Sequence, residues 1–144
     1  MESSELNSEL KCVMVIDDSL PSGVIANTAA IIGISFGKRF PEVVGCDVTD
    51  HSGKLHPGII EFPVPILRAD RDQIRSIRER LYEPSFSDLT VVDFSDVAQG
   101  CRTYDEFIGK AAKTEESDLT YLGVGICGKK KLVNKLTGFL PLLR

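Results

Sequence analysis

Acidic and amide side chains gather where two apolar segments of the sequence end. Asp18 follows the apolar run at residues 10–17, and Asp96 follows the run at residues 88–94. In open α/β sheets, ligands bind in a crevice beyond the carboxyl ends of the strands. The sequence therefore predicts one crevice that joins five polar side chains, Asp18, Asn27, Thr28, Asp96 and Gln99.

Two of these residues are candidates for catalysis. A carboxylate at a strand end is a suitable general base, and a neighbouring hydroxyl or amide orients water or substrate. Asp96 and Thr28 are the predicted catalytic residues, while Asp18, Asn27 and Gln99 are predicted to contact the ligand. The alternative for each residue is a helix cap or a turn hydrogen bond.

The glycine-rich segment GVGICGKK at residues 123–130 satisfies the GxGxxG pattern and part of a phosphate-binding loop. Such a loop needs Ser or Thr after its lysine to hold Mg²⁺, whereas this chain has Lys130 there. We therefore interpret the glycines as permitting close packing of a strand against a helix.

Three consecutive lysines, Lys129 to Lys131, begin the last predicted helix. The amides at a helix start favour anions, so Lys129 is predicted as a ligand for a weakly bound phosphate, sulfate or carboxylate. Solvated lysine side chains are the alternative interpretation.

Both histidines, His51 and His56, lie in one irregular segment at residues 46–58, together with Cys46, Asp47 and Asp50. The spacing matches no known metal site, and Asp in such segments usually forms Asx turns. We therefore expect no metal and no cofactor. This segment is predicted to form a hairpin or an ordered excursion from the core.

The four cysteines, Cys12, Cys46, Cys101 and Cys127, are widely spaced and include no CxxC pair. A chain of 144 residues builds a sufficient core without disulfides. Reduced thiols are therefore predicted rather than a disulfide framework.

The elements that position these residues alternate along the chain. Periodicity predicts strands at residues 10–17, 62–68, 88–94 and 119–126, and helices at residues 24–34, 70–81, 103–113 and 129–137. Pro63 and Pro65 remove two ladder donors, which favours an edge position for the second strand.

The helix at residues 70–81 has the clearest signals. Asp70 and Gln73 form a capping box, and an apolar stripe follows at Ile74, Ile77 and Leu81. The four arginines of this helix, Arg71, Arg75, Arg78 and Arg80, are predicted to be solvated.

Composition excludes several classes of protein. Apolar residues are 42% and charged residues 26% of the chain, as in ordinary globular domains. The net charge of −4 disfavours nucleic acid as a partner. No apolar run approaches the roughly 20 residues of a membrane span. Residues 1–9 are predicted to be a flexible segment without a secretory signal, so we expect a cytoplasmic protein with one domain at residues 10–144.

The C-terminal motif resembles that of type II peptidyl-tRNA hydrolases. Gly123-Val124-Gly125 is followed by LVNKLTGFL at residues 132–140, as in that family's signature. The first helix of those enzymes carries a Gly-Lys pair, a glutamine and a histidine. Here the corresponding positions hold Val24 after Gly23, Thr28 and Ile31, so the basic and imidazole groups are absent.

A closer resemblance is to the family named domain of unknown function 2000. It covers nearly the whole chain and includes Asp17-Asp18, Thr28-Ala29, residues 50–57, Ala69-Asp70 and KLVNKLT at residues 131–137. The resemblance implies an α/β fold, a three-layer α-β-α sandwich with a four-stranded mixed sheet, like that of type II peptidyl-tRNA hydrolases. Members of the hydrolase family often form homodimers, which makes a homodimer an expected assembly here.

Three functions follow as hypotheses. The favoured one is a small-ligand-binding or regulatory domain that keeps the hydrolase fold without its catalytic Lys and His. The second is a hydrolase or transferase that acts on a small acyl, amide or peptidyl conjugate, with Asp96 as the base. The weakest is residual peptidyl-tRNA hydrolysis, in which lysines near Lys129 contact tRNA.

Overall fold

Four strands form one mixed sheet in the order β4-β1-β6-β5. The computed structural model describes residues 9–144, so the predicted flexible segment lies outside the described residues except for Glu9. The strands are β1 (Leu10–Asp17), β4 (Ile66–Ala69), β5 (Thr90–Ser95) and β6 (Tyr121–Lys129). β1 pairs parallel with β4 and antiparallel with β6, and β5 also pairs antiparallel with β6. The predicted order of alternating strands and helices is confirmed.

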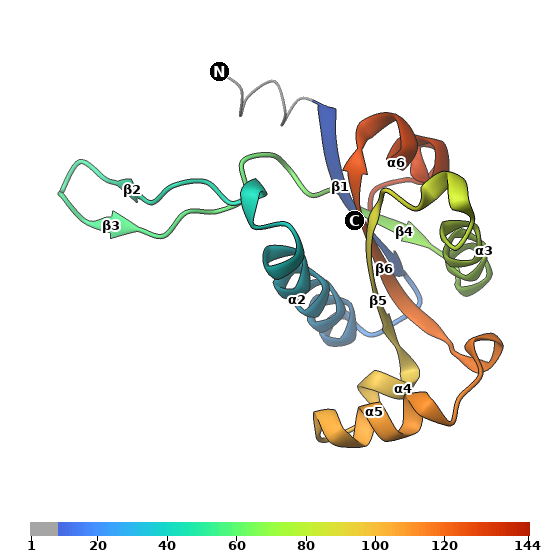
Figure 1. Cartoon of the computed structure of the whole chain (residues 1–144). Helices are drawn as coiled ribbons and strands as arrows, with labels where there is room; N and C mark the ends of the chain where they lie inside the picture. The colour runs from blue at the N-terminus through green and yellow to red at the C-terminus, as the bar shows by residue number, and fades with distance from the viewer. Residues whose placement is uncertain (1–8) are drawn as a thin grey trace.

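Helices cover both faces of the sheet (Figure 1). Helix α2 (Ser22–Arg39) packs on one face, and α3 (Arg71–Leu81) and α6 (Lys130–Thr137) pack on the other. Two further helices, α4 (Asp96–Gln99) and α5 (Tyr104–Ala112), follow the carboxyl end of β5. Short 3-10 turns occur at Pro41–Val43, Pro84–Phe86 and Glu116–Asp118. The predicted α/β class with a four-stranded mixed sheet is therefore confirmed.

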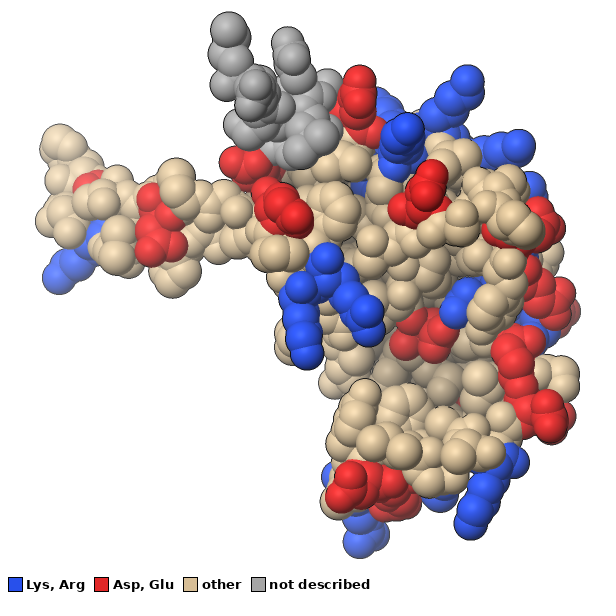
Figure 2. All heavy atoms as spheres, viewed as in Figure 1, with Lys and Arg blue, Asp and Glu red and all other residues tan. Residues whose placement is uncertain are grey.

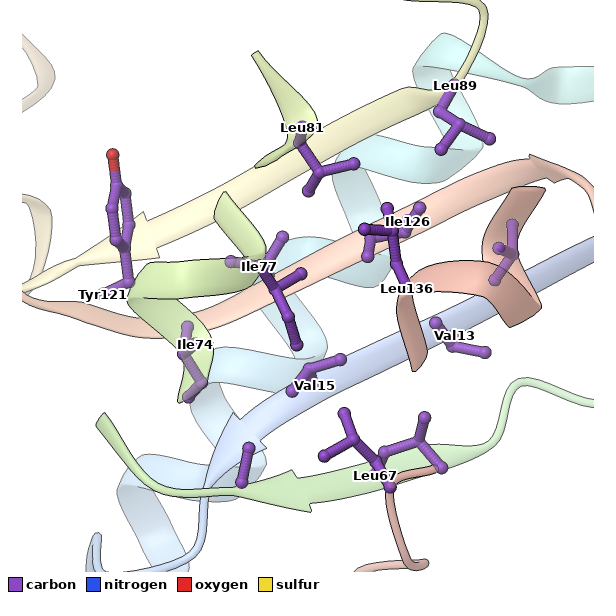
Figure 3. Packing of buried hydrophobic residues seen from close by; sticks show 14 of the residues in the cluster. Val13, Val15, Leu67, Ile74, Ile77, Leu81, Leu89, Tyr121, Ile126 and Leu136 are labelled. Atoms are coloured by element: carbon purple, nitrogen blue, oxygen red, sulfur yellow. The ribbon is translucent and has the colours of Figure 1, made fainter. Parts of the chain in front are cut away.

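The sheet separates two apolar clusters. Alternate residues of β1 point to opposite faces, so Val13 and Val15 meet α3 and α6, while Met14 and Ile16 meet α2. Figure 3 shows the first cluster, in which side chains of α3 and α6 lie over β1 and β6. Its α3 members are Ile74, Ile77 and Leu81, the predicted stripe.

Glycines in β6 let α2 approach the sheet closely. A Cβ atom on Gly123 would lie 2.7 Å from Thr28 Cγ2. Real Cβ atoms do not approach carbon so closely, because van der Waals contact begins near about 3.5 Å. The interpretation of these glycines as sites of strand-to-helix packing is confirmed for Gly123 and Gly125, whereas Gly128 meets Leu89, which lies outside the helices.

The two edges of the sheet differ. β4 is an edge strand as predicted, although Pro63 and Pro65 precede it rather than lie within it. The C-terminal residues cover this edge, because Arg68 donates its amide to the Pro141 carbonyl and Leu143 donates its amide to the Ile66 carbonyl. β5 is the other edge, and no described strand pairs with its outer side.

The capping box of α3 is confirmed, because Asp70 accepts the Gln73 amide and the Gln73 side chain accepts the Asp70 amide. The prediction of solvated arginines is wrong for two of the four. Arg75 binds the Glu116 carboxylate and the Leu119 carbonyl, and Arg78 binds Asp93 at 2.9 Å with only 13% of its side chain exposed. Both arginines thus connect α3 to distant segments, which helical periodicity does not reveal.

The prediction of reduced cysteines is wrong for Cys12 and Cys127, which form a disulfide. The two residues are direct partners in the β1–β6 register and are fully buried. Antiparallel pairing brings them together across 115 residues of sequence. Cys46 and Cys101 are free thiols.

Residues 46–57 form a projecting hairpin that is exposed along its whole length (Figure 1). Its strands are β2 (Val48–Thr49) and β3 (Leu55–His56), and Gly53 adopts a positive φ of 84° in the turn. The predicted hairpin is therefore confirmed. Within residues 9–144, no helix is long and apolar enough to cross a membrane.

Candidate functional site

A cleft of about 400 Å³ opens between α2, β5 and the α4–α5 segment, and we call it the α2–β5–α5 cleft. Figure 2 shows the surface hollowed between the body of the molecule and the α4–α5 segment at the bottom of the view. The cleft is lined by residues of all these elements: Ile31, Ser35, Val92, Asp93, Phe94, Ala98, Cys101, Arg102, Thr103, Tyr104 and Phe107.

Local hydrogen bonds set the position of the helices that form this cleft. The Ser95 hydroxyl accepts the Ala98 amide at the start of α4, and the Thr103 hydroxyl accepts the Glu106 amide at the start of α5. These are N-cap contacts, which fix where each helix begins. Helices α4 and α5 therefore begin directly after the carboxyl end of β5, where α4 contacts both β5 and α5.

The lining combines an apolar floor with a polar rim. Ile31, Val92, Phe94 and Ala98 belong to the apolar cluster on the α2 face, and Phe107 adds an aromatic ring from α5. The Cys101 thiol donates to the Val97 carbonyl at 3.1 Å, so it is already hydrogen-bonded.

Two charged side chains line the cleft, and only one of them has a partner in the part of the chain that the structure describes. Asp93 accepts a hydrogen bond from Arg78 Nε at 2.9 Å. The Arg102 guanidinium has no hydrogen-bond or ion-pair partner among residues 9–144. The unpaired charge of the cleft is therefore positive.

Thr28, a predicted catalytic residue, lies in the core. Its side chain has 0% exposure, and its hydroxyl donates to the Val24 carbonyl at 2.7 Å. Its methyl group packs over Gly123. This environment explains why α2 places a small β-branched residue there, and it leaves Thr28 no exposed surface for a ligand.

Asp96, the other predicted catalytic residue, is exposed at the junction of β5 and β6. Its Oδ1 atom accepts the Val97 amide at 2.9 Å and the Thr120 amide at 3.0 Å, and its own amide donates to the Thr120 carbonyl. No described residue binds the Oδ2 atom. One carboxylate oxygen of Asp96 thus links the end of β5 to the residue before β6, and the other oxygen faces solvent.

The predicted ligand-binding residues are divided among different surfaces. Asn27 and Gln99 are exposed on α2 and α4, and neither lines the α2–β5–α5 cleft. Asp18 lines a second hollow of about 500 Å³, beside the first turn of α2 and near Arg68 and Arg144.

Lys129 lies at the opposite end of the sheet. It pairs with Leu10 at the start of β1, whereas Asp96 is paired with Thr120, just before β6 begins. The nine residues of β6 separate these positions by roughly 30 Å. Lys129 lines a third hollow, of about 470 Å³, with Lys130, Lys131, Glu9 and Asn134.

The buried carboxylate of Asp17 has a structural role in the turn before α2. Its Oδ1 atom accepts the Ser19 amide at 2.9 Å and the Ser19 hydroxyl at 2.6 Å. These contacts hold the loop that leads into α2.

The residues of the cleft that the sequence did not reveal are Ser35, Arg102, Tyr104 and Phe107. One signal was available, because Tyr104 and Phe107 are three apart in a helix and therefore share a face. Their ring centroids lie 5.6 Å apart in an edge-to-face arrangement, and Tyr104 is 73% exposed. Exposed aromatic residues of this kind are typical of binding surfaces.

The histidine-containing hairpin holds an exposed hydrogen bond between two side chains. His56 Nε2 and Asp50 Oδ2 are 2.7 Å apart, and this hydrogen bond, with amide bonds from Lys54 and Ser52, lowers the pKa of Asp50. Among the described residues, no group of three or more His, Cys, Asp or Glu side chains is placed to hold a metal ion.

Comparison with known proteins identifies a family and a fold. No curated protein matches the chain significantly. A solved structure from Agrobacterium tumefaciens strain C58, a protein of unknown function named Atu0240, is similar with a TM-score of 0.84 and 16% identity. The similarity covers 94% of this chain and 98% of that one, and at this identity it shows the fold alone. Residues 10–144 match the family described as protein of unknown function DUF2000, and the chain therefore belongs to the DUF2000 family.

Proposed function

We propose that this protein is a ligand-binding domain without hydrolytic activity, and that the α2–β5–α5 cleft is its binding site. The observation that carries the proposal is the combination of an apolar floor with one unpaired cation, Arg102, in a cleft of about 400 Å³. Ligand sites typically measure about 300–1,000 Å³ and join apolar walls to a few polar groups.

The lining indicates the chemical class of the ligand. Ile31, Phe94 and Phe107 offer apolar contacts, and Arg102 offers a fork of donors that suits a carboxylate. An acyl or peptidyl group with a terminal carboxylate combines both features. Asp93 does not repel such an anion strongly, because Arg78 compensates its charge.

A fluorescent probe tests the cleft. We expect 1-anilinonaphthalene-8-sulfonate, which joins apolar rings to an anionic group, to bind the folded protein with enhanced fluorescence. Ser35→Phe fills the cleft and is expected to abolish binding, because Ser35 lines it. Ile34→Phe is the matched control, since Ile34 is the next residue in α2, is 76% exposed and does not line the cleft. Equal binding by both variants would contradict the proposal.

A second candidate function is hydrolysis or transfer of an acyl or amide conjugate with Asp96 as the base. The unoccupied Oδ2 atom of Asp96 favours it, because a general base must reach a water or substrate proton. Release of p-nitroaniline from N-acetylphenylalanine p-nitroanilide, lost in Asp96→Asn, supports this candidate. No release from the wild-type protein counts against it.

The homodimer implied by the hydrolase resemblance also remains a proposal. The projecting hairpin and the residues just after it offer apolar surface for it, because Val48 and Leu55 of the hairpin and Ile59 beyond it are 57%, 66% and 78% exposed. A second copy that buries these side chains would stabilise the hairpin, which is marginal as an isolated pair of strands. Sedimentation of Leu55→Lys beside the wild type tests this, and a dimer unaffected by the substitution argues against the hairpin as its interface.

A further inference from the structure

We propose that the ligand of the α2–β5–α5 cleft is the extended C-terminal end of a peptide chain, which adds as a strand to the outer edge of β5. The inference rests on the proposed function and names the class of ligand. In this arrangement the backbone of β5 holds the peptide, and Arg102 binds its terminal carboxylate.

The lining of the cleft shows that it follows the strand edge. Three consecutive residues of β5, Val92, Asp93 and Phe94, line the cleft. Side chains of a strand alternate between faces, so three in succession border one cavity only where it runs along the edge. The cleft therefore lies where an added strand would lie.

Within residues 9–144, the outer backbone groups of β5 have no hydrogen-bond partner. β5 pairs with β6 on one side, and its outward amide and carbonyl groups bind no other described residue. An edge of this kind is a template for strand addition, since every second residue directs one donor and one acceptor outward. The opposite edge, β4, is closed by residues 141–143.

The walls of the cleft form an apolar pocket for a side chain of the peptide. An added strand directs alternate side chains to the α2 face of the sheet, where Ile31 and Phe107 stand on opposite helices. An apolar peptide side chain fits between them. Peptide recognition by strand addition combines such alternate pockets with backbone hydrogen bonds.

The positive charge of Arg102 favours a peptide that ends in a free carboxylate over an internal peptide segment. Arg102 follows α4 at the carboxyl end of β5, and no described residue pairs with its guanidinium. Asp93 is held by Arg78. The anion best suited to this site is therefore a carboxylate that ends the peptide strand.

Selection from a pool of random octapeptides with free carboxyl termini tests the proposal on the full chain. We expect enrichment of peptides with apolar residues at alternate positions near the C-terminus. For the tightest peptide, amidation of the C-terminus and Arg102→Gln in the protein should each weaken binding about tenfold. The two changes together should weaken binding no further than either alone. Arg71→Gln, an exposed arginine on α3, is the control and should leave the affinity unchanged.

N-methylation of the peptide, one amide at a time, reports the strand geometry. Methylation at every second residue should weaken binding about tenfold, and methylation between those positions should have little effect. A flat profile, or amidation without effect, overturns the inference.

The outcomes separate this inference from the proposed function. If no peptide is enriched while 1-anilinonaphthalene-8-sulfonate still binds and Ser35→Phe prevents it, the cleft is a ligand site but not a peptide site. If the probe does not bind, the proposed function is contradicted, and the inference that rests on it is contradicted as well. A dimer in solution whose amide protection maps to Thr90–Ser95 would show that a second copy occupies the edge, which also overturns the inference.

Discussion

Gly125 of β6 lies directly beneath Phe36 of α2, and a Cβ atom on the glycine would stand 2.5 Å from Phe36 Cζ. This ring and the Ile32 side chain, whose Cγ2 would lie closer still to the same Cβ, occupy the space that any side chain at this position would need. The second glycine of the GxG motif is therefore required by the packing of a helix on a strand.

Gly125→Ala is expected to lower the free energy of unfolding by about 1–3 kcal/mol, because the added methyl forces Ile32 and Phe36 out of their positions. Gly109→Ala in α5 is the control. A Cβ there meets nothing within 4 Å, so relief of glycine's entropy cost should raise stability by about 0.5–1 kcal/mol. Urea denaturation of both variants measures the effects, and equal shifts would show that contact with α2 is not the cause.

Glu116 should stabilise the fold in a pH-dependent way. A hydrogen bond from Tyr121 at 2.7 Å, then one from Arg75, lowers its pKa below the usual 4.5. A carboxyl with a lowered folded-state pKa contributes stability above its unfolded pKa, and loses it as the pH falls through the folded pKa. Glu116→Gln should therefore cost about 1 kcal/mol at pH 7, allowing for solvent screening.

The difference between wild type and Glu116→Gln should shrink as the pH falls below 4.5 and disappear in stronger acid. Thermal unfolding from pH 7 to pH 2 measures it. Glu115→Gln is the control on an exposed neighbour and should show no such trend. A constant difference at every pH would mean that the charge of Glu116 is irrelevant.

The Cys12–Cys127 disulfide should leave two of the four cysteines reactive. Alkylation of the unreduced, denatured protein should modify Cys46 and Cys101 only. In the chain-entropy account, a bond across 115 residues stabilises the fold by about 5 kcal/mol. Cys12→Ala should therefore unfold at much lower urea concentration, and Cys46→Ser should not. Four reactive thiols without reductant would show that the bond is not formed.

Asp96→Ala should destabilise the protein by about 0.5–2 kcal/mol, because the Val97 and Thr120 amides lose their acceptor. Asp96→Asn keeps an acceptor oxygen and should retain most of the stability. Melting temperatures of the two variants test this structural role. A loss with Asn as large as with Ala would assign the effect to the charge instead.

Peptidyl-tRNA hydrolysis should be absent. The sequence resemblance to type II peptidyl-tRNA hydrolases implies that Val24 and Ile31 take the positions of the Lys and His of those enzymes, and neither side chain binds phosphate or moves a proton. Incubation with N-acetylated aminoacyl-tRNA should release no free tRNA beyond the uncatalysed rate. Turnover at enzyme-typical rates of about 1–10³ s⁻¹ would contradict this expectation.

Local interactions made several elements predictable. The capping box at Asp70 and the stripe at Ile74, Ile77 and Leu81 depend on residues three or four apart, and both occur as predicted. The apolar run at residues 10–17 predicted β1 with its bounds. Such features follow from short-range geometry, which the order of residues already contains.

Features made by distant pairs could not be predicted in this way. Arg75 and Glu116 are 41 residues apart, and Arg78 and Asp93 are 15 apart, so nothing in the helical pattern distinguishes these arginines from solvated ones. The disulfide depends on the antiparallel register of β1 and β6, which places Cys12 opposite Cys127.

The candidate site likewise has some features that follow from local sequence and others that depend on distant residues. Asp18 and Asp96 follow the carboxyl ends of β1 and β5, whereas the direction of β6 places Lys129 at the far end of the sheet. The α2–β5–α5 cleft combines side chains from residue 31 to residue 107, and it depends on the position of β5 at an edge where no described strand pairs with its outer side. The order of the strands and the placement of α4 and α5 result from packing of the whole core. No short stretch of sequence specifies them.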